Sequence, residues 1–293
     1  MSSVVESSEN AARGVLVSDL KFKRIVFLTG AGISAESGVA TFRDSKGLWE
    51  GHSVEDVASP SGFKRNPKLV WQFYSLRRMH AHMAQPNTAH KALAEAIQKV
   101  ESAGGRALLI TQNVDTLHER AFGALPHKNF IDIHGSLSRS KCTKCSKVYS
   151  DRWSYFSANG EICQDHADRL WSNPALPNLL SLPQLDAHGL PLSPCCSAHL
   201  RPDIVWFGER PFGIEAAIDQ LTSCELFVSI GTSGNVYPAA GFAAVARKAG
   251  AQTVCINLEQ PENHSAFQEQ IQGLATEHLP NFLGKTLHLV QKS

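Results

Sequence analysis

The fold of this chain is decided by the stretch Gly30-Ala31-Gly32-Ile33-Ser34-Ala35-Glu36-Ser37-Gly38, which directly follows the apolar run 25–29 (IVFLT). The apolar run predicts a buried strand. Glycines at its end let the backbone turn sharply and approach a ligand, and free N–H groups at the start of a following helix suit a phosphate. The spacing departs from G-x-G-x-x-G because Gly38 comes late, so a tight strand-to-helix turn is the alternative to a nucleotide site.

Apolar runs that predict strands alternate along the chain with stretches that predict helices. The predicted strands cover residues 25–29, 107–111, 130–133, 204–207, 226–230 and 253–256. The predicted helices cover residues 67–83, 88–103, 213–223, 237–249 and 262–272. This alternation is typical of a parallel sheet covered by helices on both faces. We therefore expect an α/β, Rossmann-like fold, in which ligands bind beyond the carboxyl ends of the strands.

Polar residues follow five of the predicted strands. They are the glycine loop, Gln112-Asn113-Val114-Asp115, His134-Gly135, Gly231-Thr232-Ser233 and Asn257-Leu258-Glu259. Helix capping would explain one such cluster, but five at the same edge of a sheet favour a binding site. Glu259 suits a ribose, because a carboxylate accepts hydrogen bonds from a diol.

The alternation breaks at residues 136–202, where cysteines have the spacing of a metal site. Cys142 and Cys145 form a C-x-x-C pair, and Cys195-Cys196 follows about fifty residues later. Tetrahedral zinc would hold together a small insert without a sizeable core. Side chains of adjacent cysteines diverge, so the fourth ligand is Cys195, Cys163 or His199. Buried or redox cysteines are the alternative to a metal.

These patterns divide the chain into three parts. We expect a disordered tail at 1–20, a nucleotide-binding domain from 21–135 with 203–293, and a zinc-binding insert at 136–202. No open-ligand motif such as H-E-x-x-H is present, so the expected zinc is structural.

Composition excludes other classes of function. The formal net charge of +1 gives no electrostatic case for binding nucleic acid or an acidic membrane surface. No apolar run approaches the roughly 20 residues of a membrane helix.

Seven cysteines, two of them at metal spacing, fit a reducing compartment. The N-terminus carries acids and only one arginine before Lys21, which makes a poor transit peptide. We expect a cytoplasmic monomer, with a mitochondrial location as the alternative.

Seven motifs together, in this order, resemble the sirtuin family from about residue 24 to about residue 282. They are the glycine loop, Thr41-Phe42-Arg43, Gln112-Asn113-Val114-Asp115, His134-Gly135, the Cys142–Cys145 pair, Val205-Trp206-Phe207-Gly208-Glu209 and Gly231-Thr232-Ser233. Within the family the chain is similar to the class III branch. The similarity rests on Tyr74-Ser75-Leu76-Arg77, on the small Ala58 and on Trp206.

The resemblance implies an NAD-dependent protein-lysine deacylase that releases nicotinamide and O-acyl-ADP-ribose. His134 and Asn113 would be catalytic, with His134 taking a proton from a ribose hydroxyl, as its pKa near neutrality allows. Phe42 would screen the reacting ribose carbon from water. The residues implied for NAD are Gly30, Ala31, Gly32, Ile33, Ser34, Glu36, Thr41, Phe42, Arg43, Trp49, Gln112, Asn113, Val114, Asp115, Gly231, Thr232, Ser233, Asn257, Leu258, Glu259 and Ala275. The implied zinc ligands are Cys142, Cys145, Cys195 and Cys196.

The resemblance also implies an acyl-lysine protein substrate, bound as an extended strand beside the insert. The implied substrate residues are Ala58, Tyr74, Arg77, Val205, Trp206, Phe207, Gly208, Glu209 and Tyr237. Tyr74 and Arg77 lie three residues apart and share a helix face. The resemblance implies that this pair binds the carboxylate of a succinyl or malonyl group, with acetyl also accepted. Arg78 is expected to be a surface arginine. A mono-ADP-ribosyltransferase and a non-catalytic NAD-binding scaffold remain the alternatives.

Overall fold

The computed structural model describes residues 20–40, 48–49, 51–123, 129–151, 153–163, 168–169, 180–181 and 183–287, with only the backbone described for 48–49 and 168–169. Most of the expected tail therefore falls outside the described residues. Leu20, at its end, is buried in the core. Thr41, Phe42 and Arg43 also lie outside the described residues, as does the side chain of Trp49.

The larger part of the molecule is built on one six-stranded parallel sheet. In spatial order its strands are β13 (Glu269–Gln272), β12 (Gln252–Asn257), β11 (Leu226–Ile230), β1 (Arg24–Thr29), β4 (Arg106–Thr111) and β5 (Phe130–Asp132). The chain starts at β1, builds outward through β4 and β5, and then continues on the other side with β11. This reversal makes the carboxyl ends of β1 and β11 the switch point at which doubly wound sheets bind ligands. The predicted α/β fold is confirmed.

Helices cover both faces of this sheet. One face packs against α5 (Thr88–Ser102) and α9 (Ala275–Thr286), and the other against α7 (Ile214–Leu221) and α8 (Phe242–Lys248). Along β1, Ile25 and Phe27 join the first core, whereas Val26 and Leu28 join the second. Because side chains alternate along a strand, burial on both faces explains the continuous apolar run.

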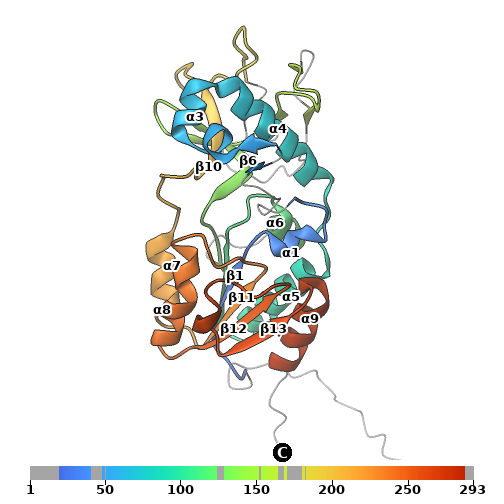
Figure 1. Cartoon of the computed structure of the whole chain (residues 1–293), viewed down its shortest axis with the longest axis vertical. Helices are drawn as coiled ribbons and strands as arrows, with labels where there is room; N and C mark the ends of the chain where they lie inside the picture. Colours follow the sequence, from blue (N-terminus) through green and yellow to red (C-terminus); the bar gives the residue numbers. More distant parts are fainter. Residues whose placement is uncertain are drawn as a thin grey trace, which may run out of the picture.

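The smaller part is built on a three-stranded antiparallel sheet and several helices, and lies above the large sheet in Figure 1. The sheet has the order β10 (Leu200–Ile204), β6 (Gly135–Cys142) and β7 (Val148–Ser150). The helices are α2 (Val54–Val57), α3 (Pro60–Arg65) and α4 (Pro67–Met83). They share buried clusters with this sheet. The insert boundaries at 136–202 stay a prediction, but the packing joins residues 54–83 to this smaller part.

The remaining elements are short. They are α1 (Gly32–Ala35), α6 (Leu117–Phe122), the 3₁₀ turns η3 (Ala239–Gly241) and η4 (His264–Ala266), and the paired strands β2 (Leu48–Trp49) with β3 (His52–Ser53) and β8 (Trp153–Ser154) with β9 (Asp168–Arg169). None of the helices in the described ranges combines the length and apolar character that crossing a membrane requires.

Two predicted elements are wrong. The predicted strand at 204–207 is instead β10, which ends at Ile204 and belongs to the small sheet. The chain then turns, because Gly208 has φ +88° and the Glu209 N–H donates to the Trp206 carbonyl at 2.9 Å. The predicted helix at 262–272 is η4 followed by β13, which pairs with β12 at the sheet edge.

Candidate active site

Two glycine-containing loops meet at the switch point of the large sheet. The Gly30 N–H donates to the Ile230 carbonyl at 3.0 Å, and the Gly32 N–H donates to the Gly231 carbonyl at 2.9 Å. A Cβ on Gly32 would lie only 2.7 Å from the Gly231 Cα, and Gly231 itself has φ +63°. Side chains are therefore excluded at Gly32 and Gly231, and the loop after β1 lies directly against the loop after β11.

The Asn113 side chain is held in one orientation beside the first glycine loop. Its Nδ2 donates to the Gly30 carbonyl and to the Ser34 Oγ, both at 3.1 Å. Ser34 is in turn 3.4 Å from the Nε2 of His90, whose Nδ1 lies 2.9 Å from the Asn87 Oδ1. Because both amide hydrogens of Asn113 are used, a ligand would contact this side chain through Oδ1, which can only accept a hydrogen bond.

His90 is a site neighbour that sequence reasoning missed. It lies in the first turn of α5, where the Asn87 side chain caps the helix by accepting from the N–H groups of Ala89 and His90. The sequence feature that could have identified His90 is its position on the first turn of the helix, three residues after Asn87. Burial lowers the pKa of His90 to about 4, so the ring is neutral near pH 7.

Asp115 lies in the loop after β4, and its side chain is buried. Its Oδ1 accepts from the Leu117 N–H at 3.0 Å. Burial raises the pKa of Asp115, while hydrogen bonds from Leu117 and Ser34 and, less strongly, the positive charge of Arg77 oppose that rise.

His134 lies where the chain passes from β5 into β6. Its Nδ1 is 3.1 Å from the Gln112 carbonyl oxygen, which can only accept, so Nδ1 carries the hydrogen and Nε2 has a free lone pair. Burial lowers the pKa of His134, and the Gln112 hydrogen bond opposes this shift. The neutral ring with a basic Nε2 is therefore the form present near pH 7.

Residues expected to contact an acyl group come together between α4 and the segment after β10. Tyr74 is fully buried, and its hydroxyl accepts from the Trp206 Nε1 at 3.0 Å. Arg77 is 8% exposed. Ala58, Tyr74 and Trp206 share one buried cluster, and the Phe207 N–H donates to the Ala58 carbonyl at 3.0 Å. Burial raises the pKa of Tyr74 to about 12, so its hydroxyl stays protonated.

Arg78, which we expected at the surface, is completely buried. Its Nη1 lies 3.0 Å from the Asp151 carboxylate, and both side chains are 0% exposed. The expectation is wrong because Asp151 lies in the smaller part of the molecule, 73 positions away in the sequence.

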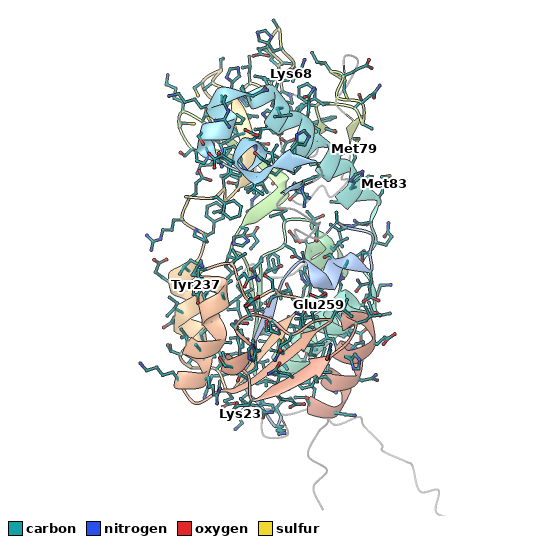
Figure 2. The ribbon with its side chains drawn as sticks, viewed as in Figure 1. Lys23, Lys68, Met79, Met83, Tyr237 and Glu259 are labelled. Atoms are coloured by element: carbon teal, nitrogen blue, oxygen red, sulfur yellow. The ribbon has the colours of Figure 1, made fainter. Side chains whose placement is uncertain are left out.

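Other expected site residues lie along the same edge of the large sheet. The Asn257 Nδ2 donates to the carbonyls of Thr232, at 2.9 Å, and Glu259, at 2.8 Å, which joins the loops after β11 and β12. The Glu36 carboxylate accepts from the Thr276 hydroxyl at 2.6 Å, beside Ala275 at the start of α9. Figure 2 shows the exposed Tyr237 and Glu259 on the larger part, toward the middle of the molecule.

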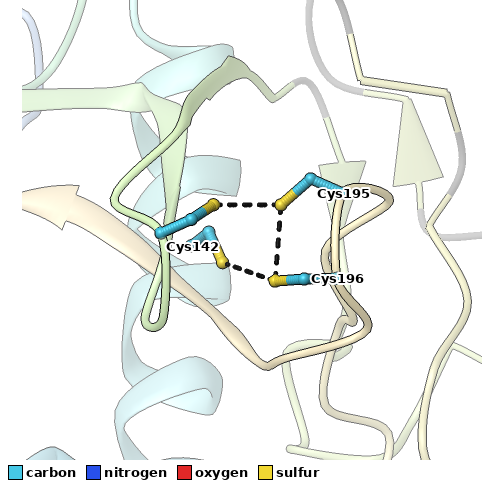
Figure 3. Close-up of side chains that lie close together, drawn as sticks. Cys142, Cys195 and Cys196 are labelled. Carbon is cyan, nitrogen blue, oxygen red and sulfur yellow. Dashed lines mark hydrogen bonds between the residues drawn. The ribbon is translucent and has the colours of Figure 1, made fainter.

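Four cysteines of the smaller part form a group that could hold a metal ion. Sγ atoms of Cys142, Cys145, Cys195 and Cys196 all lie within 4.8 Å of one another. The separations are 3.4 Å for Cys142–Cys196, 3.0 Å for Cys145–Cys195 and 3.4 Å for Cys195–Cys196, as Figure 3 illustrates. Tetrahedral zinc places its sulfur ligands about 3.8 Å apart, so the group fits one zinc ion.

The alternatives for the fourth metal ligand lie elsewhere. His199 Nε2 is 3.0 Å from the Asp186 carboxylate, and neither His199 nor Cys163 joins the metal-binding group found among the described residues. The adjacent Cys195 and Cys196 converge because the chain turns at them, where Ser197 has φ +55°.

Comparison with known proteins gives consistent matches. A model of the Sir2 family matches residues 30–238. A Pasteurella multocida protein named NAD-dependent protein deacylase is 46% identical over 268 residues, which cover 90% of this chain and 98% of that protein. A Shewanella oneidensis protein of the same name is 41% identical over 269 residues, which cover 91% of this chain and 95% of that protein.

Solved structures match over a similar length. A Sir2 homologue in complex with NAD is 32% identical with a TM-score of 0.70, covering 92% of both chains. A Sir2 protein bound to an acetylated peptide is 26% identical with a TM-score of 0.66, covering 90% of this chain and 94% of that chain.

Proposed function

The chain belongs to the Sir2 family, and from this premise we propose that it uses NAD to remove succinyl and malonyl groups, and also acetyl groups, from protein lysines. The chain is an NAD-dependent protein deacylase of the type that its relatives are named for. The products of the proposed reaction are the free lysine, nicotinamide and O-acyl-ADP-ribose.

The observation that carries the choice of acyl group is the pair Tyr74 and Arg77. Both side chains are buried and lie one turn apart on α4, and the Tyr74 hydroxyl contacts Trp206. The planar fork of donors on Arg77 matches a carboxylate, and the protonated Tyr74 hydroxyl adds one more donor. A side chain as small as that of Ala58, in the same buried cluster as Tyr74, would leave room for a chain longer than acetyl.

NAD fits the edge of the large sheet at the proposed site. The glycine loop, Asn113, Asp115, Gly231 and Glu259 all follow strands at that edge. The Oδ1 of Asn113 and the buried Asp115 would bind the nicotinamide end, and the loop backbone would bind the phosphates. When bound, NAD supplies the ribose carbon that accepts the acyl oxygen. The roles of Thr41, Phe42, Arg43 and Trp49 stay predictions from the sequence.

His134 is the proposed general base. Its Nδ1 hydrogen is held by the Gln112 carbonyl, which leaves Nε2 to remove a proton from a ribose hydroxyl. Because burial lowers the pKa of His134, the ring is neutral at neutral pH and can act directly as a base.

The proposed zinc site and the proposed peptide-binding site lie in different regions of the molecule. Cys142, Cys145, Cys195 and Cys196 would hold zinc in the smaller part, where it would support the small sheet. The peptide would bind between the two parts as an extended strand, beside the exposed side chains of Phe207 and Tyr237. Hydrogen bonds to the peptide backbone discriminate little between peptide sequences. We therefore expect the enzyme to select its substrates mainly by their acyl group.

The experiment that tests this function is a panel of one peptide carrying acetyl-, malonyl-, succinyl- or glutaryl-lysine, incubated with NAD and followed by mass spectrometry. We expect NAD-dependent loss of the succinyl and malonyl groups together with acyl-ADP-ribose. Loss of acetyl alone would contradict the proposed acyl preference. ADP-ribose attached to protein, without acyl-ADP-ribose, would instead indicate a mono-ADP-ribosyltransferase.

A further inference from the structure

A stacked side-chain assembly links the small sheet to Tyr74. Arg201 on β10 places its guanidinium carbon 3.5 Å from the centre of the Trp206 ring. The Phe63 ring also packs on Trp206, with centroids 5.4 Å apart. A cation this close to an indole face is attracted by the ring electrons. Arg201 and Phe63 thus fix the plane of the Trp206 ring.

Glu209 fixes both Arg201 and the backbone of Trp206. The Arg201 Nη1 and Nη2 donate to the two carboxylate oxygens of Glu209 at 2.7 and 2.8 Å. The backbone N–H of Trp206 donates to the same carboxylate at 2.9 Å. A bidentate pair of this kind is geometrically specific, so ring and backbone of Trp206 depend on one ion pair.

Trp206 in turn determines what the Tyr74 hydroxyl can do. An indole N–H can only donate, so the Tyr74 oxygen accepts the Trp206 hydrogen at 3.0 Å. The Tyr74 hydrogen must then point elsewhere, and within the described part of the chain no group accepts it. Tyr74 is fully buried, and a buried donor without an acceptor is unfavourable. The carboxylate of an acyl group, next to Arg77, would supply that acceptor.

We propose that Arg201 is a positioning residue for acyl selectivity: by holding Trp206, it directs the Tyr74 hydroxyl hydrogen toward the terminal carboxylate of an acyl-lysine. The inference rests on the proposed function, because only an acyl group with a terminal carboxylate uses that hydrogen. An acetyl group has no such acceptor, so its removal depends much less on Arg201.

The test compares Arg201→Gln with a matched control, Arg139→Gln. Arg139 also lies on the small sheet and also pairs with carboxylates, but its partners are Asp132 at 2.6 Å and Asp203 at 2.9 Å rather than Glu209. For each variant, kcat and KM are measured with one peptide carrying either succinyl- or acetyl-lysine. We expect Arg201→Gln to lower the succinyl-to-acetyl ratio of kcat/KM about tenfold, mainly through a higher KM for the succinyl peptide. Arg139→Gln should leave that ratio within about twofold.

A second variant covers the case in which Arg201→Gln does not fold. Trp206→Phe keeps an aromatic ring but removes the N–H that Tyr74 accepts, so we expect it to lower the same ratio. In a Tyr74→Phe background, Arg201→Gln should cause no further fall. An unchanged ratio in both Arg201→Gln and Trp206→Phe, or a full additional fall without the Tyr74 hydroxyl, would overturn the inference.

Arg77→Met, measured in the same assay, separates failure of the inference from failure of the proposed function. If Arg77→Met collapses the succinyl-to-acetyl ratio while Arg201→Gln and Trp206→Phe do not, only the inference is overturned. If the unmodified protein removes no succinyl group, or if Arg77→Met leaves the ratio unchanged, the proposed function fails and the inference fails with it.

Discussion

Arg78 and Asp151 form an ion pair that is completely excluded from solvent, with the Arg78 Nη1 3.0 Å from the Asp151 carboxylate. The guanidinium also donates to the carbonyls of Trp153, at 2.8 Å, and Arg139, at 3.0 Å. The Tyr155 hydroxyl donates to Asp151 at 2.9 Å. This network attaches α4, which carries Tyr74 and Arg77, to the smaller part of the molecule.

Removing Arg78 should therefore destabilise the fold strongly. Arg78→Met leaves the Asp151 carboxylate buried without its cation, which typically costs about 3–5 kcal/mol of the free energy of unfolding. Urea unfolding of the zinc-loaded protein measures this loss. The control is Arg65→Met, because Arg65 makes an exposed pair with Asp56 and should contribute less than about 1 kcal/mol. Similar losses in the two variants would contradict a structural role for the buried pair.

The sequence predicted the parts of the fold that local patterns determine. The runs at 25–29, 107–111 and 226–230 alternate with helices and are buried on both faces, so they were recognisable as central strands. The edge strand β13, with the sequence EQIQ, has only Ile271 as an apolar residue and carries no such signal. Its place in the sheet is determined by pairing with β12, which a local pattern does not contain.

The residues of the candidate site also fall into those that local sequence patterns predict and those that they do not. Asn113 and His134 were identified because they follow strands and match family motifs. The burial of Arg78 depends on Asp151, 73 positions away, and the role of His90 depends on its contact with Ser34, 56 positions away. Such long-range partners are set by tertiary packing, which explains why sequence reasoning placed Arg78 at the surface and missed His90.

His134 should make the reaction fail in acid. Because burial lowers the pKa of His134 below its ordinary value near 6.5, we expect kcat/KM to be constant at neutral pH and to fall only below about pH 6.5 as Nε2 is protonated. The pH profile with an acetyl-lysine peptide at saturating NAD checks this. A fall with a midpoint above pH 7 would exclude His134 as a buried, neutral base.

A variant of His134 isolates the base from its hydrogen bond. The side-chain amide of His134→Asn can still donate to the Gln112 carbonyl, but it cannot remove a proton. We expect deacylation to fall about 10²- to 10⁴-fold, while NAD binding, measured by calorimetry, changes little. Near-normal turnover of any acyl peptide would remove His134 from the mechanism.

His90 should make the folded protein sensitive to acid. The unfolded chain binds a proton on this residue near pH 6.5, whereas the buried ring, with a pKa of about 4, does not. Stability due to neutral His90 is therefore present above pH 6.5 and lost as the pH falls toward 4. Between pH 7.5 and 5 the loss is about 2 kcal/mol, and His90→Gln should lack it. Equal pH dependence of the free energy of unfolding in both proteins would contradict this.

The cysteine group should bind one zinc ion per chain. Cys142→Ala removes a ligand, so zinc content measured by mass spectrometry should fall well below one ion and the smaller part should lose stability, since structural zinc contributes to folding free energy. Cys163→Ala is the matched control and should keep its zinc, because Cys163 lies outside the group of four. Absence of zinc from the unmodified protein, or its loss in Cys163→Ala alone, would refute the proposed ligand set.

The central claim is that Arg77 reads the carboxylate of the acyl group, and Arg77→Met tests it most directly. Losing one partner of a desolvated charge pair typically costs about 2–5 kcal/mol, or roughly 30- to several-thousand-fold. The measurement is kcat/KM for succinyl- and acetyl-lysine versions of one peptide, with Lys68→Met, an exposed cation on the same helix, as the control. The account predicts that Arg77→Met lowers desuccinylation at least tens-fold and spares deacetylation, and that Lys68→Met changes neither. An equal fall in both activities of Arg77→Met, or no change in either, would contradict it.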